Sequence, residues 1–299
     1  MIRNFTYQIK KEQEGMTVRE YLKAHGFPNA VFVRLKKTPE SILLNGVWVY
    51  VTAPLHTGDL LSVTLTEMEG SKNLTPSFLP LSVCYEDEDI LVVDKPAHMP
   101  VHPSMGHHEN TLANAVTGYY AKQGIPYTFR CVNRLDRDTT GLTILAKHML
   151  SSAILSTQAA RREISREYLA IVEGLTPDSG TVDAPIARKS DSAIERVVDF
   201  RRGEAAVTHY RRLAYENGLS LLSLHLETGR THQIRVHMKY IGHPLIGDFL
   251  YNPESRIMKR QALHAYRLQF THPVTGAFID LKVPPAADMA AVFPDFSAF

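Results

Sequence analysis

The sequence CVNRLDRDTTGLTILAK, at residues 131–147, contains a charged loop, a glycine and an apolar run in that order. The run at 142–146 is rich in β-prone residues and predicts a buried strand. Loops held by a rigid strand often carry functional residues, and Asp136 lies in such a loop between Arg134 and Arg137. Because nearby positive charge favours the anion, this carboxylate is expected to stay ionised and to serve as nucleophile or general base. The alternative is a solvated turn with surface ion pairs.

Several other stretches carry distinctive patterns. They are YEDEDILVVDKPAHMPVHPS at 85–104, REYLA at 166–170, LETGRTHQIRVH at 226–237, GHPLIGD at 242–248 and LHA at 263–265. Together with NRLDRDTTG at 133–141, they resemble the ordered motifs of the RluA-type pseudouridine synthases, which isomerise uridine to pseudouridine in ribosomal or transfer RNA. One such motif is weak evidence, but several in the family's order, over about residues 80–285, are strong evidence.

The resemblance assigns catalysis to three residues. It implies that Asp136 acts on the ribose, that Tyr168 lies on the uracil and takes part in proton transfer, and that Arg235 pairs with Asp136. An arginine suits this place because its planar guanidinium can hold a carboxylate in one orientation and stays charged where water is scarce. The sequence leaves open whether Asp136 attacks C1′ or removes the proton from C2′.

The same resemblance implies RNA contacts for a wider set of residues. Arg134 is expected to fill the space that the flipped base vacates. Two positions depart from the usual motif, since Asn133 replaces a His and Thr140 replaces a Ser, and both keep hydrogen-bonding capacity. The expected substrate contacts of this region are Asn133, Arg134, Arg137, His102, Thr140, Arg230, His232 and Gln233.

Periodicity predicts both helices and strands in this part of the chain. Strands are expected at 83–85, 90–93, 142–146, 163–172 and 219–226, and helices at 111–123, 150–162 and after the turn at 228–229. The resemblance implies that the fold class is α+β. The resemblance implies the pseudouridine synthase fold, a central and mostly antiparallel mixed sheet with flanking helices. Residues 183–212 are rich in Arg and Lys and are expected to form a hairpin-like arm, either against RNA or simply solvated.

The first 66 residues show a pattern of their own. Thr17 is a candidate N-cap of a helix at 17–25, and a basic helix is expected at 31–37. Alternation around two turn signals at 42–65 predicts small strands. This order resembles a degenerate S4-like RNA-binding module.

The module suggests a division of the chain at residues 67–80. These residues contain glycine, serine and proline and are the expected linker, and 81–299 is the expected catalytic domain. The basic helix carries Lys36 and Lys37, which are expected to contact phosphate, although a solvated face is an equal alternative.

Composition excludes several classes of protein. The 299 residues are 44% hydrophobic and 21% charged with a net charge of +2, which is ordinary for a globular protein and leaves nucleic-acid binding open. No apolar run is long enough to cross a bilayer, and the polar residues 1–11 do not form a signal peptide. Two cysteines make no disulfide framework, so we expect a reducing, cytoplasmic environment. We also expect a monomer. Cys131 lies near Asp136, but no activating pattern marks it as a nucleophile.

The sequence predicts neither a metal nor a cofactor. His98, His102, His107 and His108 crowd one loop, but their spacing matches no zinc signature. Isomerisation of uridine involves no redox change and no group donor, and the chain lacks Walker A and Rossmann fingerprints.

Other functions and targets are weighed against this interpretation. The fold could serve a non-catalytic RNA-binding or ribosome-assembly factor, against which the intact catalytic set argues. A glycoside hydrolase normally needs two carboxylates facing one bond, and the third motif supplies Arg235 where an acid is needed. For the synthase, large-subunit ribosomal RNA is favoured over transfer RNA, because an added RNA-binding module suits a large structured target.

Overall fold

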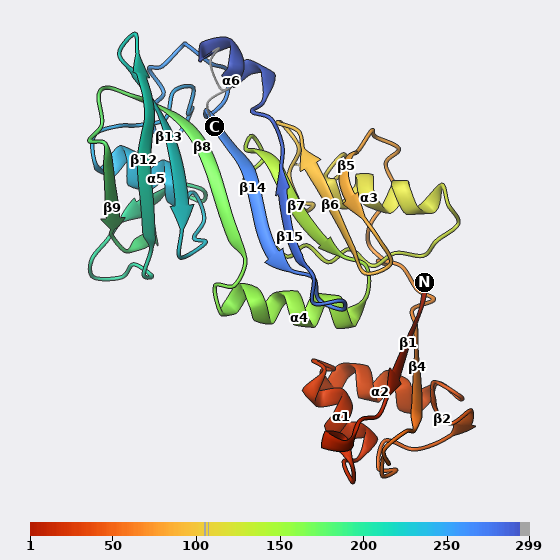
Figure 1. The fold of residues 1–299 in the computed structure, drawn as a ribbon. Coiled ribbons are helices and arrows are strands. Elements are labelled where there is room, and N and C mark those ends of the chain that lie inside the picture. Colours follow the sequence, from red (N-terminus) through yellow and green to blue (C-terminus); the bar gives the residue numbers. More distant parts are fainter. Residues whose placement is uncertain (105, 107, 294–299) are drawn as a thin grey trace.

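A large mixed sheet forms the centre of the fold (Figure 1), in a computed structural model that describes residues 1–293 except 105 and 107. In spatial order its strands are β5 (Ser82–Glu86), β6 (Ile90–Lys95), β7 (Thr140–Ala146), β14 (Leu263–Thr271), β8 (Ser165–Glu173), β13 (Leu219–Leu226), β12 (Val207–Glu216) and β9 (Ser179–Asp183), and β15 (Phe278–Lys282) pairs with β14. The strand pairs are antiparallel except β7 with β14. The expected α+β class with a mostly antiparallel mixed sheet is confirmed.

The strand predicted at 142–146 is β7, and all its residues are buried. It pairs with β6 on one side and, over a short parallel stretch, with β14 on the other. Gly141 has a φ of 112°, and a Cβ at this position would lie only 2.2 Å from the carbonyl oxygen of Ala265. Only glycine therefore allows β7 and β14 to approach so closely. This contact fixes the point at which the loop at 132–139 meets the sheet.

Helices cover both faces of the strands around β6. Val116 of α3 (Leu112–Ala121) packs with Leu91, whereas Leu155 of α4 (Met149–Ala160) packs with Ile90. Because neighbouring strand residues point to opposite faces, these two helices lie on opposite sides of the sheet. No helix in the described part of the chain is long and apolar enough to span a bilayer.

The helix α5 (Gln233–Tyr240) covers the half of the sheet formed by β8, β13 and β12. Ile234 and Met238 pack in one cluster with Tyr168 of β8 and Leu224 of β13. The helix predicted after the turn at 228–229 is confirmed. The N-terminal end of α5 points toward the loop at 132–139. A further short helix, α6 (Ala287–Val292), follows β15.

The first 66 residues form a smaller sheet with two helices, drawn in red and orange in Figure 1. Its elements are β1 (Ile2–Gln8), the 3-10 helix η1 (Lys11–Gln13), α1 (Val18–Ala24), α2 (Asn29–Lys37), β2 (Ile42–Leu44), β3 (Val47–Trp48) and β4 (Leu60–Thr66), with the strand order β1-β4-β2-β3. Thr17 caps α1 by accepting a hydrogen bond from the N–H of Glu20, as expected. The strand β1 was not predicted, because Phe5 is its one buried residue and its apolar alternation is weak.

Residues 67–81 contain neither helix nor strand and connect the two sheets. Glu67 accepts hydrogen bonds from the guanidinium of Arg130 over 2.6 Å and from the N–H of Met149 over 2.8 Å. Arg3 of the small sheet pairs with Asp89 at 2.8 Å. The domain boundaries at residues 66 and 80 stay a prediction.

The expectation of a single arm at 183–212 is wrong at its C-terminal end. The strands β10 (Ile186–Arg188) and β11 (Arg196–Val198) do form a two-stranded hairpin. Residues 207–212, however, belong to β12 and pair with both β9 and β13. Thr208 and Tyr210 alternate inward from this strand, and their burial outweighs the exposed charge of Arg211.

Candidate active site

A cavity of about 310 Å³ lies between the loop at 132–139, β8, the end of β13 and the N-terminal end of α5. Its walls are strongly basic, with the side chains of Arg134, Arg166, Arg230 and Arg235. Among the described residues that line it, Asp136 is the only acid. Since hydrolysis of a glycosidic bond normally needs two facing carboxylates, the glycoside hydrolase alternative finds no second acid here.

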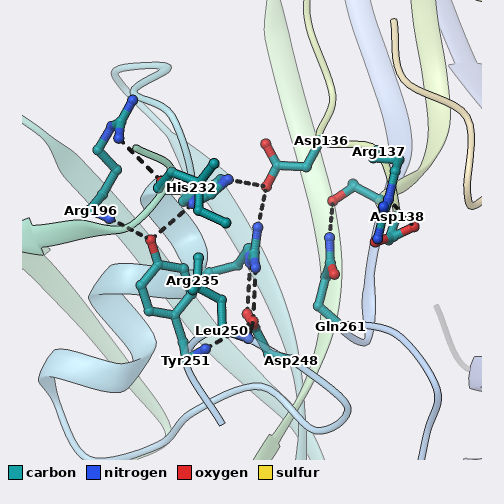
Figure 2. A network of polar contacts seen from close by, with 12 residues as sticks. Asp136, Arg137, Asp138, Arg196, His232, Arg235, Asp248, Leu250, Tyr251 and Gln261 are labelled. Atoms are coloured by element: carbon teal, nitrogen blue, oxygen red, sulfur yellow. Dashed lines mark hydrogen bonds and ion pairs between the residues drawn. The ribbon is translucent and has the colours of Figure 1, made fainter. Parts of the chain in front are cut away.

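Asp136 presents one anchored oxygen and one open oxygen (Figure 2). Its Oδ2 accepts a hydrogen bond from Nη1 of Arg235 over 3.0 Å, whereas no described residue donates to Oδ1. The side chain remains 25% exposed and lines the cavity, so Oδ1 is the carboxylate oxygen without a described partner in this wall. The N–H of Thr139 donates to the carbonyl of Asp136 over 3.1 Å and closes the turn that positions it. The expected pairing of Asp136 with Arg235 is present.

A buried carboxylate on the far side holds Arg235 in place. Nε and Nη2 of Arg235 donate to the two oxygens of Asp248 over 2.7 and 2.8 Å, and the ring of Tyr251 lies 4.9 Å from the guanidinium carbon. Burial lowers the pKa of Arg235, but the hydrogen bonds to Asp248 and the charge of Asp136 outweigh burial and raise it above its ordinary value. The guanidinium is therefore a permanent cation with a fixed orientation.

Tyr168 forms part of the cavity wall from the middle of β8. Its ring is buried, and this burial raises the pKa of the phenol above its ordinary value. At neutral pH the hydroxyl therefore keeps its proton, and Tyr168 lies in the wall that also carries Asp136.

Five other predicted contacts line the cavity, namely Asn133, Arg134, Arg230, His232 and Gln233. The Gln233 amide is already engaged, because Nε2 donates to the carbonyl of Val207 over 2.9 Å and Oε1 accepts from the N–H of Arg230 over 3.0 Å. Gln233 thus fixes the turn before α5. Arg230 itself pairs with Glu204.

Asn133 lines the cavity, but its amide binds the neighbouring strand. Its Nδ2 donates to the carbonyl of Leu142 over 3.0 Å, and its Oδ1 accepts from the N–H of Ile144 over 2.7 Å. These bonds use the amide to attach the loop to β7. The structure thus gives Asn133 a positioning role at the place where the family motif usually has a His.

Five predicted RNA contacts lie outside the cavity lining. Thr140 bonds Nδ1 of His264 at 2.8 Å, Arg137 pairs with Asp138 at 2.8 Å, and the ring of His102 packs edge-on against Phe129. Lys36 and Lys37 are exposed at the end of α2 in the small N-terminal sheet. Contacts of these residues with RNA elsewhere on the surface stay a prediction.

Two site residues were missed by the sequence reasoning. Arg166 lines the cavity beside Tyr168. Its spacing of two residues from Tyr168 on the predicted strand was the signal in the sequence that both side chains share one face. Asp248 lies within a motif that was noticed, yet no pattern in the sequence indicated that it pairs with Arg235.

The thiol of Cys131 is not a nucleophile. Burial raises its pKa to about 12, and its Sγ donates to the carbonyl oxygen of Asn133 over 3.0 Å. At neutral pH it is a protonated, packed side chain.

One group of described residues has metal-ligand geometry, and it lies away from the cavity. Ligand atoms of Asp87, Asp89 and His272 lie within 4.8 Å of one another. Arg3 and His148 already bind the Asp89 carboxylate, so protein cations and donors occupy the cluster. In the histidine-rich loop, His98 pairs with Asp138 at 2.8 Å, and His107 lies outside the described residues.

Comparison with known proteins agrees with this geometry. The sequence profile of the RNA pseudouridylate synthases matches residues 89–240, which include Asp136, Tyr168 and Arg235. The uncharacterized RNA pseudouridine synthase YjbO of Bacillus subtilis is 40% identical over 276 residues, 92% of this chain and 97% of the relative. The ribosomal large subunit pseudouridine synthase D of Zymomonas mobilis is 43% identical over 232 residues, 73% of each chain.

Solved structures give the same result for the fold. The human RNA pseudouridylate synthase domain containing 1 superposes with a TM-score of 0.59 at 25% identity, over 70% of this chain and 84% of that one. The expected pseudouridine synthase fold is confirmed. The chain therefore belongs to the RluA-type RNA pseudouridine synthases, isomerases that convert uridine in RNA to pseudouridine.

Proposed function

We propose that Asp136 is the catalytic carboxylate of this synthase and that its target is a uridine of large-subunit ribosomal RNA. The observation that carries the first part is the asymmetry of Asp136, a cavity-lining residue whose Oδ2 is held by Arg235 while Oδ1 has no described partner. An ionised, oriented and partly desolvated oxygen is what attack at C1′, or abstraction of the proton at C2′, requires.

The roles proposed for the other cavity residues follow from the bonds that the reaction breaks and forms. The C1′–N1 bond breaks, a C1′–C5 bond forms, C5 loses its proton and N1 gains one. The uridine has to leave its stack first, which costs on the order of a few kcal/mol. The arginines of the cavity offset this cost through the RNA backbone, and Arg134 occupies the space that the base leaves. Tyr168 stacks on the uracil and supplies a proton-transfer group.

The target is proposed from the relatives and from the N-terminal residues. Relatives from Pasteurella multocida and Escherichia coli, which carry the name ribosomal large subunit pseudouridine synthase D, align with 94% and 95% of this chain. The alignment thus extends over the small N-terminal sheet. We propose that this sheet acts as an S4-like module in which Lys36 and Lys37 bind phosphate, and that the enzyme works as a monomer.

Mapping of pseudouridine in cellular RNA tests both parts together. Total RNA is compared from cells with the gene, without it, and with the deletion complemented by the Asp136→Ala protein at matched expression. We expect one or more sites in large-subunit ribosomal RNA to disappear in the second and third samples. Restoration of the site by Asp136→Ala would reject the catalytic assignment, and loss of a site in transfer RNA alone would reject the target.

A further inference from the structure

His232 has a strained backbone and a ring that is held on one side. It precedes α5 with a φ of 59°, in the left-handed region that few residues other than glycine adopt. Its Nδ1 lies 2.9 Å from Oη of Tyr251, and its Nε2 lies 3.8 Å from Oδ2 of Asp136. Figure 2 shows the ring between these two partners. Strained residues of this kind are held by their surroundings and often serve a function.

The hydrogen bonds of Tyr251 determine which nitrogen of His232 carries the hydrogen. The backbone N–H of Arg196 donates to Oη of Tyr251 over 2.9 Å, so Oη acts as an acceptor there. A phenol has a single hydrogen to donate, and Nδ1 of His232 is the one acceptor that the described residues offer it. A buried donor left without an acceptor would cost free energy. Oη therefore donates to Nδ1, and the hydrogen of the neutral ring is on Nε2.

The charge states of both rings agree with this arrangement. Burial lowers the pKa of His232, and its effect together with the nearby charges of Arg235 and Arg196 outweighs the opposite effect of Asp136 and Asp248. Burial also raises the pKa of the Tyr251 phenol to about 12. At neutral pH the imidazole is therefore neutral, the phenol keeps its proton, and an N–H faces Asp136.

We propose that His232 is a positioning residue that holds Oδ2 of Asp136 through its Nε2–H, and that Arg196 and Tyr251 fix this tautomer through their hydrogen bonds. The proposal rests on the catalytic role of Asp136 proposed above. With Arg235 alone, a single donor holds Oδ2, and the carboxylate can turn about its bond to Cβ. A second donor on the same oxygen leaves Oδ1 as the oxygen that faces the ribose.

The distance of 3.8 Å is longer than a hydrogen bond, and we expect it to shorten when RNA binds. Catalytic hydrogen bonds are commonly long in free enzymes and shorten in the complex with substrate. The chain of donors begins in the hairpin of β10 and β11, whose strands pair with each other and not with the main sheet. RNA that contacts this hairpin thus has a route of three side chains, Tyr251, His232 and Asp136, to the reacting oxygen.

Two substitutions separate this role from a purely structural one. His232→Gln puts an amide N–H the same number of bonds from Cβ as Nε2, whereas His232→Asn puts it where Nδ1 was. Asparagine tolerates the left-handed backbone better than glutamine does. If His232 is purely structural, the Asn variant should be the more stable protein and no less active. If His232 positions Asp136, the Gln variant should have the higher kcat.

The assay uses total RNA from cells that lack the gene and were grown with uracil tritiated at C5, so that it does not depend on which RNA is the target. Formation of pseudouridine releases this tritium. We expect His232→Asn to lower kcat on the order of 10²-fold with KM nearly unchanged, and His232→Gln to recover most of the loss. Tyr251→Phe, which removes the link to the hairpin, is expected to lower kcat less. Equal kcat for the Asn and Gln variants, or a change confined to KM, would overturn the proposal.

A spectroscopic measurement tests the tautomer without reference to activity. In the folded wild-type protein at pH 7, long-range proton–nitrogen correlation spectra of the imidazole, assigned by loss of the signal in His232→Gln, should show hydrogen on Nε2 and none on Nδ1. Hydrogen on Nδ1, or a charged ring, would overturn the proposal. This spectrum does not depend on turnover, so it tests the His232 tautomer alone. Activity in an Asp136 variant would instead reject Asp136 as the catalytic residue.

Discussion

The two sides of the loop at 132–139 carry similar residues in different surroundings. On the cavity side, Asp136 has one anchored oxygen and one open oxygen, and its side chain is 25% exposed. On the packed side, both oxygens of Asp138 accept hydrogen bonds from Arg137, one also from His98, and the side chain is 5% exposed. The same pair of residue types thus gives one carboxylate with an open oxygen and one whose two oxygens are both bonded.

The difference comes from where the partners lie in the sequence. Asp138 is held by its neighbour Arg137, whereas Asp136 meets Arg235, which is 99 residues away and is itself held by Asp248. A local partner can wrap around a carboxylate and use all of its oxygens. A distant and rigid partner can approach from one direction and leave the other oxygen open for substrate.

Replacement of Arg235, on the cavity side of the loop, should have the largest effect on turnover and stability. Arg235→Met removes the anchor of Asp136 and leaves Asp248 buried without its cation, which should abolish turnover and cost about 3–5 kcal/mol of the free energy of unfolding. Denaturant titration measures the cost. The double variant Arg235→Met/Asp248→Leu serves as the control, since it should recover stability but not activity. Full turnover in either variant would contradict the anchoring role.

The next largest effect on turnover should come from the loss of a single hydroxyl in the cavity wall. Tyr168→Phe keeps the buried ring but removes the phenol, whose raised pKa keeps it protonated at neutral pH. We expect kcat to fall about 10²-fold or more, with little change in KM or stability. Stopped single-turnover assays measure this step directly. A rise in KM with unchanged kcat would show that Tyr168 binds the base without transferring a proton.

Replacement of Asp138, on the packed side of the loop, should instead change the stability of the protein and the dependence of that stability on pH. Burial raises the pKa of Asp138, but Arg137 and His98 outweigh burial and hold the pKa below its ordinary value. The ionised carboxylate therefore stabilises the fold above the unfolded-state pKa of about 4, and this contribution disappears as the pH falls through the lower folded-state pKa. Asp138→Asn should cost about 1–3 kcal/mol at pH 7.

Unfolding curves of wild-type protein and Asp138→Asn between neutral and acidic pH measure this difference. The gap between the two proteins should narrow on acidification. A gap that stays constant, or widens, below pH 4 would mean that the charge of Asp138 is not what stabilises the loop.

The smallest effect is expected far from the cavity, in the N-terminal residues. If Lys36 and Lys37 contact phosphate, replacing both with alanine should weaken RNA binding and lower the slope of log affinity against log salt by about 1 for each lysine, with kcat unchanged. Lys10→Ala/Lys11→Ala, on the exposed turn η1 of the same small sheet, is the matched control. Identical salt dependence in both variants would favour a solvated face for α2.

Much of this organisation could be predicted from sequence, because its determinants are local. The buried run of β7, the Thr17 cap and the apolar stripe of α5 are visible in short windows. The strand β1 was missed, because Phe5 alone is buried in it, and β12 was taken as part of a basic arm, because its arginines hid the inward alternation.

The three residues proposed for catalysis were chosen for another reason, since the motifs around Asp136, Tyr168 and Arg235 resemble a known family. The orientation of these residues was not predictable. The contacts of Asp248 and His232 are created when distant segments fold together, and neither the direction of the Asp136 oxygens nor the tautomer that we propose for His232 leaves a trace in residue order.

The most direct test of the central claim compares the two carboxylates of the loop in one experiment. Asp136→Asn and Asp138→Asn proteins are mixed in excess with the tritiated RNA, and tritium release is followed through a single turnover. The account predicts no release above background for Asp136→Asn, a loss on the order of 10⁴-fold or more, and a rate within about tenfold of wild type for folded Asp138→Asn. Comparable rates for the two variants would contradict it.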